Sequence, residues 1–472
     1  MRRRIRHLVT VLTATAALVL PTAATSVATP ASERPHLVAE LFSGPANLDW
    51  TATTAGLKAG RPLAALGLTA RGTSAAPTLA SETKESQAHA RDGSTGPRAS
   101  SHVTNAPFDP TAEPAELTLA DCASGAAAGP VYAPDRFDIC ETAVLGAREL
   151  EEPGDIVQGV AEFTDTLIGG AGFGDQADRA LAFQEYISNV SAFPVGPAWN
   201  PAIFFDSESF CTAVLGSGAC RSRTDFHVGL LTDWLANGGD SWQFALTVPP
   251  GGGVGRDDII KEVLNEGFNV VFPPPFDARN PIVKMPDLNV RWDDASYVKN
   301  GYGGDGAAIF DYIPPLIYNM HGQGTDEVAA HIADALLYPD QTVPAEPPGV
   351  TKVLPGFIDN PLHRLYRRYS PPTSVLRYDR NGRIARGTCG ARNGLDCDEF
   401  PMASTYEGAA KAEYEPYSDP NAYSVRLVDP EQNRTAGGIA KLFYRYYRVL
   451  DPGYDANYHP QNWDAFYVEI LS

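Results

Sequence analysis

The N-terminus sets the conditions under which the rest of this chain folds. Residues 2–6 carry four arginines, residues 8–20 are apolar and uncharged, and small residues follow up to Ala28. This is the layout of a secretory signal peptide, and the apolar run is short for a membrane span. An uncleaved signal anchor is the alternative. We expect residues 1–28 to be a signal peptide and the mature protein to be secreted and extracellular, without a membrane segment.

Export places the six cysteines in an oxidising environment. They fall into three pairs that are close in sequence, which favours local disulfides although other connectivities remain open. No Cys-x-x-Cys occurs, and the spacing of the last pair does not resemble a zinc ribbon, so we reject zinc binding by these residues. The expected disulfide partners are Cys122 with Cys140, Cys211 with Cys220, and Cys389 with Cys397.

The length of 472 residues exceeds one typical core, which predicts two folded domains after the leader. Residues 29–115 are rich in Ala, Thr, Ser, Gly and Pro without periodicity, and we expect a disordered linker or pro-region there. Residues 116–348 contain short alternating or apolar runs bounded by Gly, Pro or Asp, which predicts a β-rich domain of unknown role. The glycine tract 251–255 lacks the Lys-Ser/Thr of a phosphate loop and is read as a surface turn.

The formal charge of −20 is unevenly distributed. Residues 351–472 contain fifteen basic and fifteen acidic residues, so the excess of acid precedes them. Between residues 364 and 392, eight arginines accompany one acid and three tyrosines. Arginine suits phosphate and aromatic rings can stack on bases, so this strip predicts polyanion binding; a salt-bridged surface is the alternative. The candidate DNA-binding residues are Arg364, Arg367, Arg368, Arg383 and Arg386.

Two motifs carry candidate chemistry. Asp398 and Glu399 follow Cys397, and Pro401 then stops a strand or forces a bend, which places the two acids at the end of an element. Farther on, Asn433 precedes a segment in which apolar residues recur at helical spacing from residue 439. Asn433 would then stand just ahead of a helix N-terminus, where anions are favoured, or would simply cap that helix. Residues 466–470 predict a final strand.

These motifs together resemble the NucA/NucB-type secreted deoxyribonucleases. The hallmark of that family runs Cys-Asp-Glu, an aromatic residue and Pro-x-Ala, then Glu-Gly, then Asn-Arg-x-x-Gly before a helix and a strand. The matching stretches are residues 397–403, 407–408 and 433–437, and residues 361–364 and 381–383 look like the approach in larger actinobacterial members. The resemblance covers residues 354–471, and a weaker one includes residues 310–314 and 331–332. Ala409 replaces a common second glycine, and residues 414–421 lengthen a loop near the motifs.

Phosphodiester hydrolysis indicates what these residues would do. A divalent cation polarises the phosphoryl oxygen and activates water, and Mg²⁺ or Mn²⁺ needs few protein ligands, mainly oxygens. Asp398 and Asn433 can supply such oxygens, and the resemblance implies Asp398 as the central catalytic carboxylate. Either Glu399 or Glu407 would orient or deprotonate water, and Arg434 would neutralise the phosphate.

Structural alternatives stand beside these roles. Glu399 could pair with a nearby arginine, and Glu407 could form a surface ion pair. His363, the one histidine in the arginine strip, could serve as a general base or be structural. A glycosidase would need two carboxyls facing each other across a cleft, whereas adjacent acids on an extended chain point apart.

The sequence therefore predicts an α+β protein. Its C-terminal domain, residues 349–472, would consist of strands and a helix that carries the metal site, an arrangement similar to the HNH or ββα-metal nucleases. The expected activity is that of a secreted, metal-dependent endonuclease acting on extracellular DNA, with RNA as the other candidate substrate. The alternative function is a non-catalytic polyanion-binding or adhesive protein with a nuclease-like fold. Oligomeric state and biological purpose stay open.

Overall fold

The computed structural model describes most of the chain after its leader. The described residues are 36–70, 117–126, 130–171, 179–217, 220–222, 227–272, 276–278, 282–298, 307–321, 324–366, 372–415, 417–452 and 464–471. The expected signal peptide and much of the expected linker lie outside this part of the chain.

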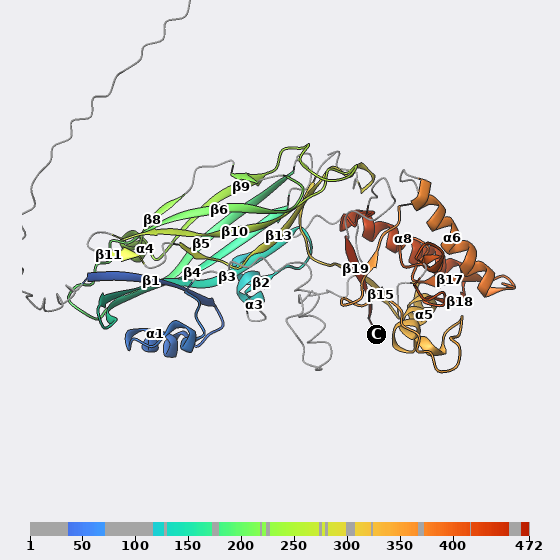
Figure 1. Cartoon of the computed structure of the whole chain (residues 1–472), viewed down its shortest axis with the longest axis horizontal. Helices are drawn as coiled ribbons and strands as arrows, with labels where there is room; N and C mark the ends of the chain where they lie inside the picture. Colours follow the sequence, from blue (N-terminus) through green and yellow to red (C-terminus); the bar gives the residue numbers. More distant parts are fainter. Residues whose placement is uncertain are drawn as a thin grey trace, which may run out of the picture. The chain divides into compact units, whose positions relative to one another are not determined.

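Two mainly antiparallel sheets form the β-rich region (Figure 1). The first contains, in spatial order, β11 (Phe276–Ala278), β1 (His36–Pro45), β3 (Asp138–Glu152), β4 (Ile156–Ala171), β5 (Ala180–Pro194), β9 (Asp240–Thr247) and β7 (Arg221–Ser222), with β2 (Val131–Tyr132) beside β3. The second contains β14 (Ala307–Phe310), β13 (Leu288–Asp293), β10 (Ile260–Val271), β6 (Phe204–Leu215) and β8 (Val228–Leu230), with β12 (Ile282–Lys284) beside β10.

The two sheets face each other across an apolar interior. Phe163 of β4 makes edge-to-face contacts with Phe205 of β6 and Phe268 of β10, at ring-centroid distances of 5.0 and 5.8 Å. The edge-to-face geometry suits aromatic quadrupoles and fills the space between sheets. Short helices accompany the strands, among them α3 (Leu119–Gly125), α4 (Leu231–Asn237) and the 3-10 helix η2 (Ser296–Val298). We call this part of the molecule the β-sandwich.

The expected disordered linker over residues 29–115 is wrong for residues 36–70. Strand β1 pairs with β3 over ten residues, from His36 opposite Glu152 to Pro45 opposite Ala143. Helix α1 (Trp50–Lys58) and the 3-10 helix η1 (Leu63–Leu66) follow it. Their apolar side chains pack with Leu150 and Val160 in a separate core cluster. Ordering here comes from these distant strands, which a local composition of small residues does not reveal.

The C-terminal region combines helices with short strands. Its three-stranded sheet has the order β15 (Pro315–Asn319), β19 (Ala465–Leu471), β16 (Leu362–His363), and β17 (Asp396–Phe400) pairs with β18 (Ser424–Val428). The helices are α5 (Asp326–Leu337), η3 (Pro339–Gln341), α6 (Pro372–Cys389), α7 (Lys411–Tyr414) and α8 (Pro430–Tyr446). The described chain thus has mixed α and β structure with mainly antiparallel pairing, as expected for the α+β class.

The core of this region starts earlier than the expected boundary at residue 348. Leu316 of β15 and Val328 and Ile332 of α5 are buried in the same cluster as Phe443 of α8 and Phe466 of β19. Strand β15 also pairs in parallel with β19 along its whole length. The proline-rich segment near residue 344 therefore lies within the C-terminal region and does not separate two domains.

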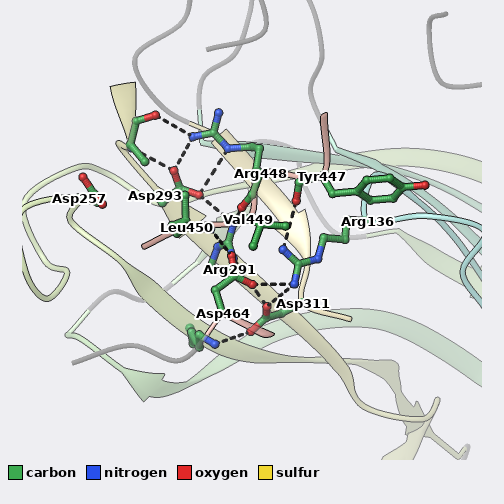
Figure 2. A network of polar contacts seen from close by, with 12 residues as sticks. Arg136, Asp257, Arg291, Asp293, Asp311, Tyr447, Arg448, Val449, Leu450 and Asp464 are labelled. Atoms are coloured by element: carbon green, nitrogen blue, oxygen red, sulfur yellow. Dashed lines mark hydrogen bonds and ion pairs between the residues drawn. The ribbon is translucent and has the colours of Figure 1, made fainter. Parts of the chain in front are cut away.

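Buried ion pairs connect the β-sandwich to the C-terminal region (Figure 2). Asp464 lies 2.7 Å from Arg136 and 2.5 Å from Arg291, measured between carboxylate oxygens and guanidinium nitrogens. Arg291 also donates to the backbone carbonyl of Arg448, and Arg448 in turn pairs with Asp293. Burial alone would raise the pKa of Asp464, but the two guanidinium groups lower it below its usual range. The carboxylate therefore stays charged inside the protein.

The six cysteines form the three expected disulfides, Cys122–Cys140, Cys211–Cys220 and Cys389–Cys397. These bonds agree with an oxidising compartment. No helix within the described part of the chain is long and apolar enough to cross a membrane.

Candidate functional site

A cavity of about 690 Å³ lies in the C-terminal region, and Asp398, Glu399 and Asn433 line it. Its wall is formed by β17, α8, α5, α6, β15, the turn after β17 and the segment after β16, together with η2 from the β-sandwich. The polar and charged side chains in this wall are those of Ser296, Tyr297, Tyr318, Arg364, Tyr366, Tyr378, Asp398, Glu399, Ser404, Asn433, Lys441, Tyr444 and Arg445.

Asp398 lies in the middle of strand β17. The strand is held on one side by β18, where Asp398 stands opposite Arg426, and on the other by the Cys389–Cys397 disulfide to the end of α6. Only 7% of the residue is exposed, and it contributes to the cavity wall. The hairpin and the disulfide together leave this carboxylate little freedom to move.

His331 holds the Asp398 carboxylate. The Nδ1 atom of His331 lies 2.6 Å from Oδ2 of Asp398, and its Nε2 atom lies 2.8 Å from Oγ of Ser424. Because an ionised carboxylate only accepts, Nδ1 carries the proton and Nε2 can accept from the serine hydroxyl. His331 is fully buried on α5. Residues 331–332 belong to the weaker part of the family resemblance, but a lone histidine on an apolar helix face, 67 residues from its partner, gives no local indication of a chemical role.

Glu399 follows Asp398 in the strand, and it also lines the cavity. Its carboxylate accepts from the backbone N–H of Ala403 in the turn after β17. Burial, and then the negative charge of Asp398, raise the pKa of Glu399 to about 7, although Arg386 opposes this shift. The turn at residues 401–404 thus brings both acids to one cavity, where simple strand alternation would send them to opposite faces.

Asn433 reaches the same cavity from α8. The helix begins at Pro430 and not after residue 437, because the side chain of Asp429 accepts from the backbone N–H groups of Glu431 and Gln432. Asp429 is therefore the cap, and the expected position of Asn433 ahead of the helix is wrong by one turn. Asn433 lies within the first turns of α8, with its side chain not needed as the cap.

One face of α8 supplies both space and positive charge. Ala436, Gly437 and Ala440 line the cavity at helical spacing, and a Cβ added at Gly437 would meet no atom within 4 Å. Lys441 and Arg445 follow on the same face. The small residues leave room for a ligand, and the two cations lie where they can attract an anionic one.

The arginines singled out from the sequence have different surroundings. Arg383 and Arg386 are exposed on α6, and Arg434 is exposed on α8 but does not line the cavity. Arg367 and Arg368 lie outside the described residues.

Arg364 is buried and held by aromatic rings and a backbone carbonyl. Its guanidinium carbon is about 5 Å from the ring centroids of Tyr297, Tyr366 and Tyr444, and Nη1 donates to the carbonyl of Val449. The expected role of Arg364 as an open DNA contact does not match this cage. It instead fixes the cavity wall, in which the β-sandwich takes part through Tyr297.

Glu407 is bound away from the cavity. Its two carboxylate oxygens accept from the backbone N–H of His363 at 2.9 Å and from Nδ1 of His363 at 2.7 Å. The neighbouring Gly408 packs so tightly on Asn381 that an added Cβ would lie 2.3 Å from its side-chain nitrogen. Asn381 also donates to the carbonyls of Ala403 and Thr405. The Glu-Gly pair and Asn381 therefore fix the loop after β17, and none of the three residues lines the cavity.

No protein-family model, curated protein or solved structure matches this chain. The interpretation of the site therefore depends on its own geometry.

Proposed function

We propose that this protein is a secreted, metal-dependent endonuclease that hydrolyses phosphodiester bonds of extracellular DNA. The observation that carries the proposal is the convergence of Asp398, Glu399 and Asn433 on one cavity, although Asn433 is far from the two acids in sequence. These are the residues on which the resemblance to the NucA/NucB-type deoxyribonucleases depends. The signal-peptide pattern and the disulfides support the extracellular location.

The donor set suits a hard divalent cation. Asp398 and Asn433 both offer oxygen, and Mg²⁺ or Mn²⁺ takes one or two such protein ligands and keeps several waters. The Nδ1–H of His331 occupies one oxygen of Asp398, which orients the other oxygen. When bound, the cation would polarise a phosphoryl oxygen and lower the pKa of a bound water.

Glu399 is the better candidate for the base. It lines the cavity with a pKa raised to about 7, so it can take a proton from water near neutral pH. Glu407 is engaged by His363, which leaves it the structural role described above. Lys441 and Arg445 line the wall and can neutralise phosphate oxygens. Arg434 is exposed about two turns before Lys441 on α8 and can contact the DNA backbone beside the scissile phosphate.

A cleavage assay tests the proposal. Wild-type protein should degrade plasmid DNA in the presence of Mg²⁺ or Mn²⁺, and a chelator should stop the reaction. The cleavage rate of Asp398→Asn should be at least about a hundred-fold lower than that of the wild type, because an amide binds a cation more weakly than a carboxylate does. Glu413→Gln, which removes an exposed acid paired with Arg380, is the matched control and should keep wild-type activity. If the protein shifted DNA on a gel but never cut it, the proposed nuclease activity would be rejected and a DNA-binding module would be favoured.

A further inference from the structure

Four acidic side chains are buried between the two sheets of the β-sandwich. They are Glu141 of β3, Asp165 of β4, Glu185 of β5 and Glu266 of β10, and none is more than 1% exposed. We call these four residues the carboxylate layer. They lie far in sequence from the cavity residues and are not part of the proposed active site.

The carboxylate layer divides the interior of the β-sandwich into two apolar halves. On β4, Asp165 stands between Phe163, which belongs to one core cluster, and Leu167, which belongs to the other. Glu266 on β10 likewise stands between Leu264 and Phe268 of the two clusters. Because residues two apart in a strand share a face, these acids point into the core with their neighbours. The same alternation holds on β3 and β5.

The acids have little to compensate their burial. Within the described residues, neither carboxylate oxygen of Glu141 has a hydrogen-bonding partner. Asp165 and Glu185 lie close enough to share a hydrogen bond, which needs a proton between them, and Asp165 also accepts from the backbone N–H of Thr166. Glu266 alone accepts from hydroxyl groups, those of Ser207 and Ser209 on β6. Burial first, and then the charges of the other acids, raise the pKa of Glu141 and Glu185 well above the usual value. The layer is therefore a site where negative charge is costly without a cation.

We propose that the carboxylate layer binds a hard divalent cation of the calcium class inside the β-sandwich. Carboxylates and serine hydroxyls are oxygen ligands, and Ca²⁺ accepts six to eight oxygens in flexible geometry. Each buried carboxylate would gain a positive partner, and Glu141 would gain its first polar contact. A cation in this place would join β3, β4 and β5 of one sheet to β10 of the other.

Binding would draw the four side chains together. In the described part of the chain, three candidate ligand atoms lie within 4.8 Å of one another only at Cys211, Cys220 and Glu262, and there both sulfurs are consumed by a disulfide. The carboxylate layer is wider than this, so side-chain rotation or bridging water must complete the coordination. The inward contraction is an expected consequence of binding.

Metal content and thermal unfolding of the full chain test this proposal. After gel filtration in metal-free buffer, elemental analysis should find about one calcium per chain that persists in Asp398→Asn, in which the proposed nuclease site is impaired. Calcium chloride should raise the unfolding midpoint by about 5 °C or more over chelator, as expected for a ligand that binds only the folded state.

Two variants and a control locate the effect. Asp165→Asn and Glu185→Gln should lose the bound calcium and the response of the midpoint to calcium. Glu149→Gln should keep both, because Glu149 is a fully buried acid of the same sheet that accepts from the backbone N–H of Asn200 outside the layer.

The opposite pattern would overturn the proposal. Wild-type protein without bound metal, whose midpoint ignores both calcium and chelator, would show that the acids are held as neutral groups that share protons. A midpoint of Glu185→Gln equal to or above that of the wild type would count against the cation in the same way, since removal of a ligand cannot stabilise the bound form. If both variants fail to fold, the wild-type metal content and calcium response decide alone.

Discussion

Asp398 has its freedom restricted from three directions. The β18 strand, the Cys389–Cys397 disulfide and the Nδ1–H of His331 all constrain it. A side chain that holds a cation or a phosphate binds more tightly when its rotamer is already fixed, because little conformational entropy is then lost when the ligand binds. His331 thus acts on the chemistry through Asp398 as a positioning residue.

Glu399 predicts the pH dependence of the proposed reaction. Its pKa is raised to about 7, so the protonated, inactive form dominates below this value and the base form above it. Activity should therefore rise with pH to a plateau, with a midpoint at or below about 7, because a cation held by Asp398 would lower that pKa. Glu399→Gln should lower kcat by about 10²- to 10⁴-fold and should abolish this rise of activity with pH. Initial rates of DNA cleavage from about pH 5 to about pH 9 provide the measurement.

Glu413→Gln serves as the control for the pH profile, since it removes an exposed acid and should leave the rise of activity with pH unchanged. If Glu399→Gln kept both the wild-type rate and the rise of activity with pH, another group would be the base.

At the scale of elements, the sequence identified strands and helices whose signals are local. The final strand was expected at residues 466–470 and spans Ala465–Leu471. The apolar spacing predicts α8 but places its start too late, because the helix begins with the Asp429-Pro430 cap and its first turns contain few apolar residues. An aspartate followed by a proline is a local signal for a helix start, so the sequence itself contains the information that places the start at Pro430.

Other elements depend on contacts that no local pattern contains. Strand β1 lies in a segment dominated by small residues, and its order comes from β3, about a hundred residues away. Similarly, α5 places His331 against Asp398. The sequence motifs identify Asp398, Glu399 and Asn433 as candidates. They do not distinguish an acid that lines the cavity from one that is hydrogen-bonded to a neighbouring side chain, as Glu407 is to His363.

At the scale of the whole molecule, the acidic β-sandwich contributes to the site and to its support. Tyr297 stacks on Tyr366 at 4.4 Å between ring centroids, and its hydroxyl accepts from the backbone N–H of Asp451. The ion pairs around Asp464 lie next to these contacts and tie β13 to the segment after α8. A change in this buried network should therefore affect folding of both regions.

Asp464→Asn should destabilise the protein by about 3–5 kcal/mol, because two buried guanidinium groups lose their shared carboxylate. Urea unfolding, followed by tryptophan fluorescence, measures this as a lower midpoint. The matched control is Asp334→Asn, which removes an exposed partner of Arg426 at 2.7 Å and should cost less than about 1 kcal/mol. Equal effects of the two substitutions would mean that the buried network does not connect the regions.

The most direct measurement of the central claim is the position of Mn²⁺ in crystals of the wild-type protein, located by anomalous diffraction. We expect a peak in the cavity of the C-terminal region, about 2.0–2.5 Å from an oxygen of Asp398 and from the side-chain oxygen of Asn433, and no peak there in Asp398→Asn. If crystals of catalytically active protein held Mn²⁺ away from both residues, the proposed metal site would be wrong.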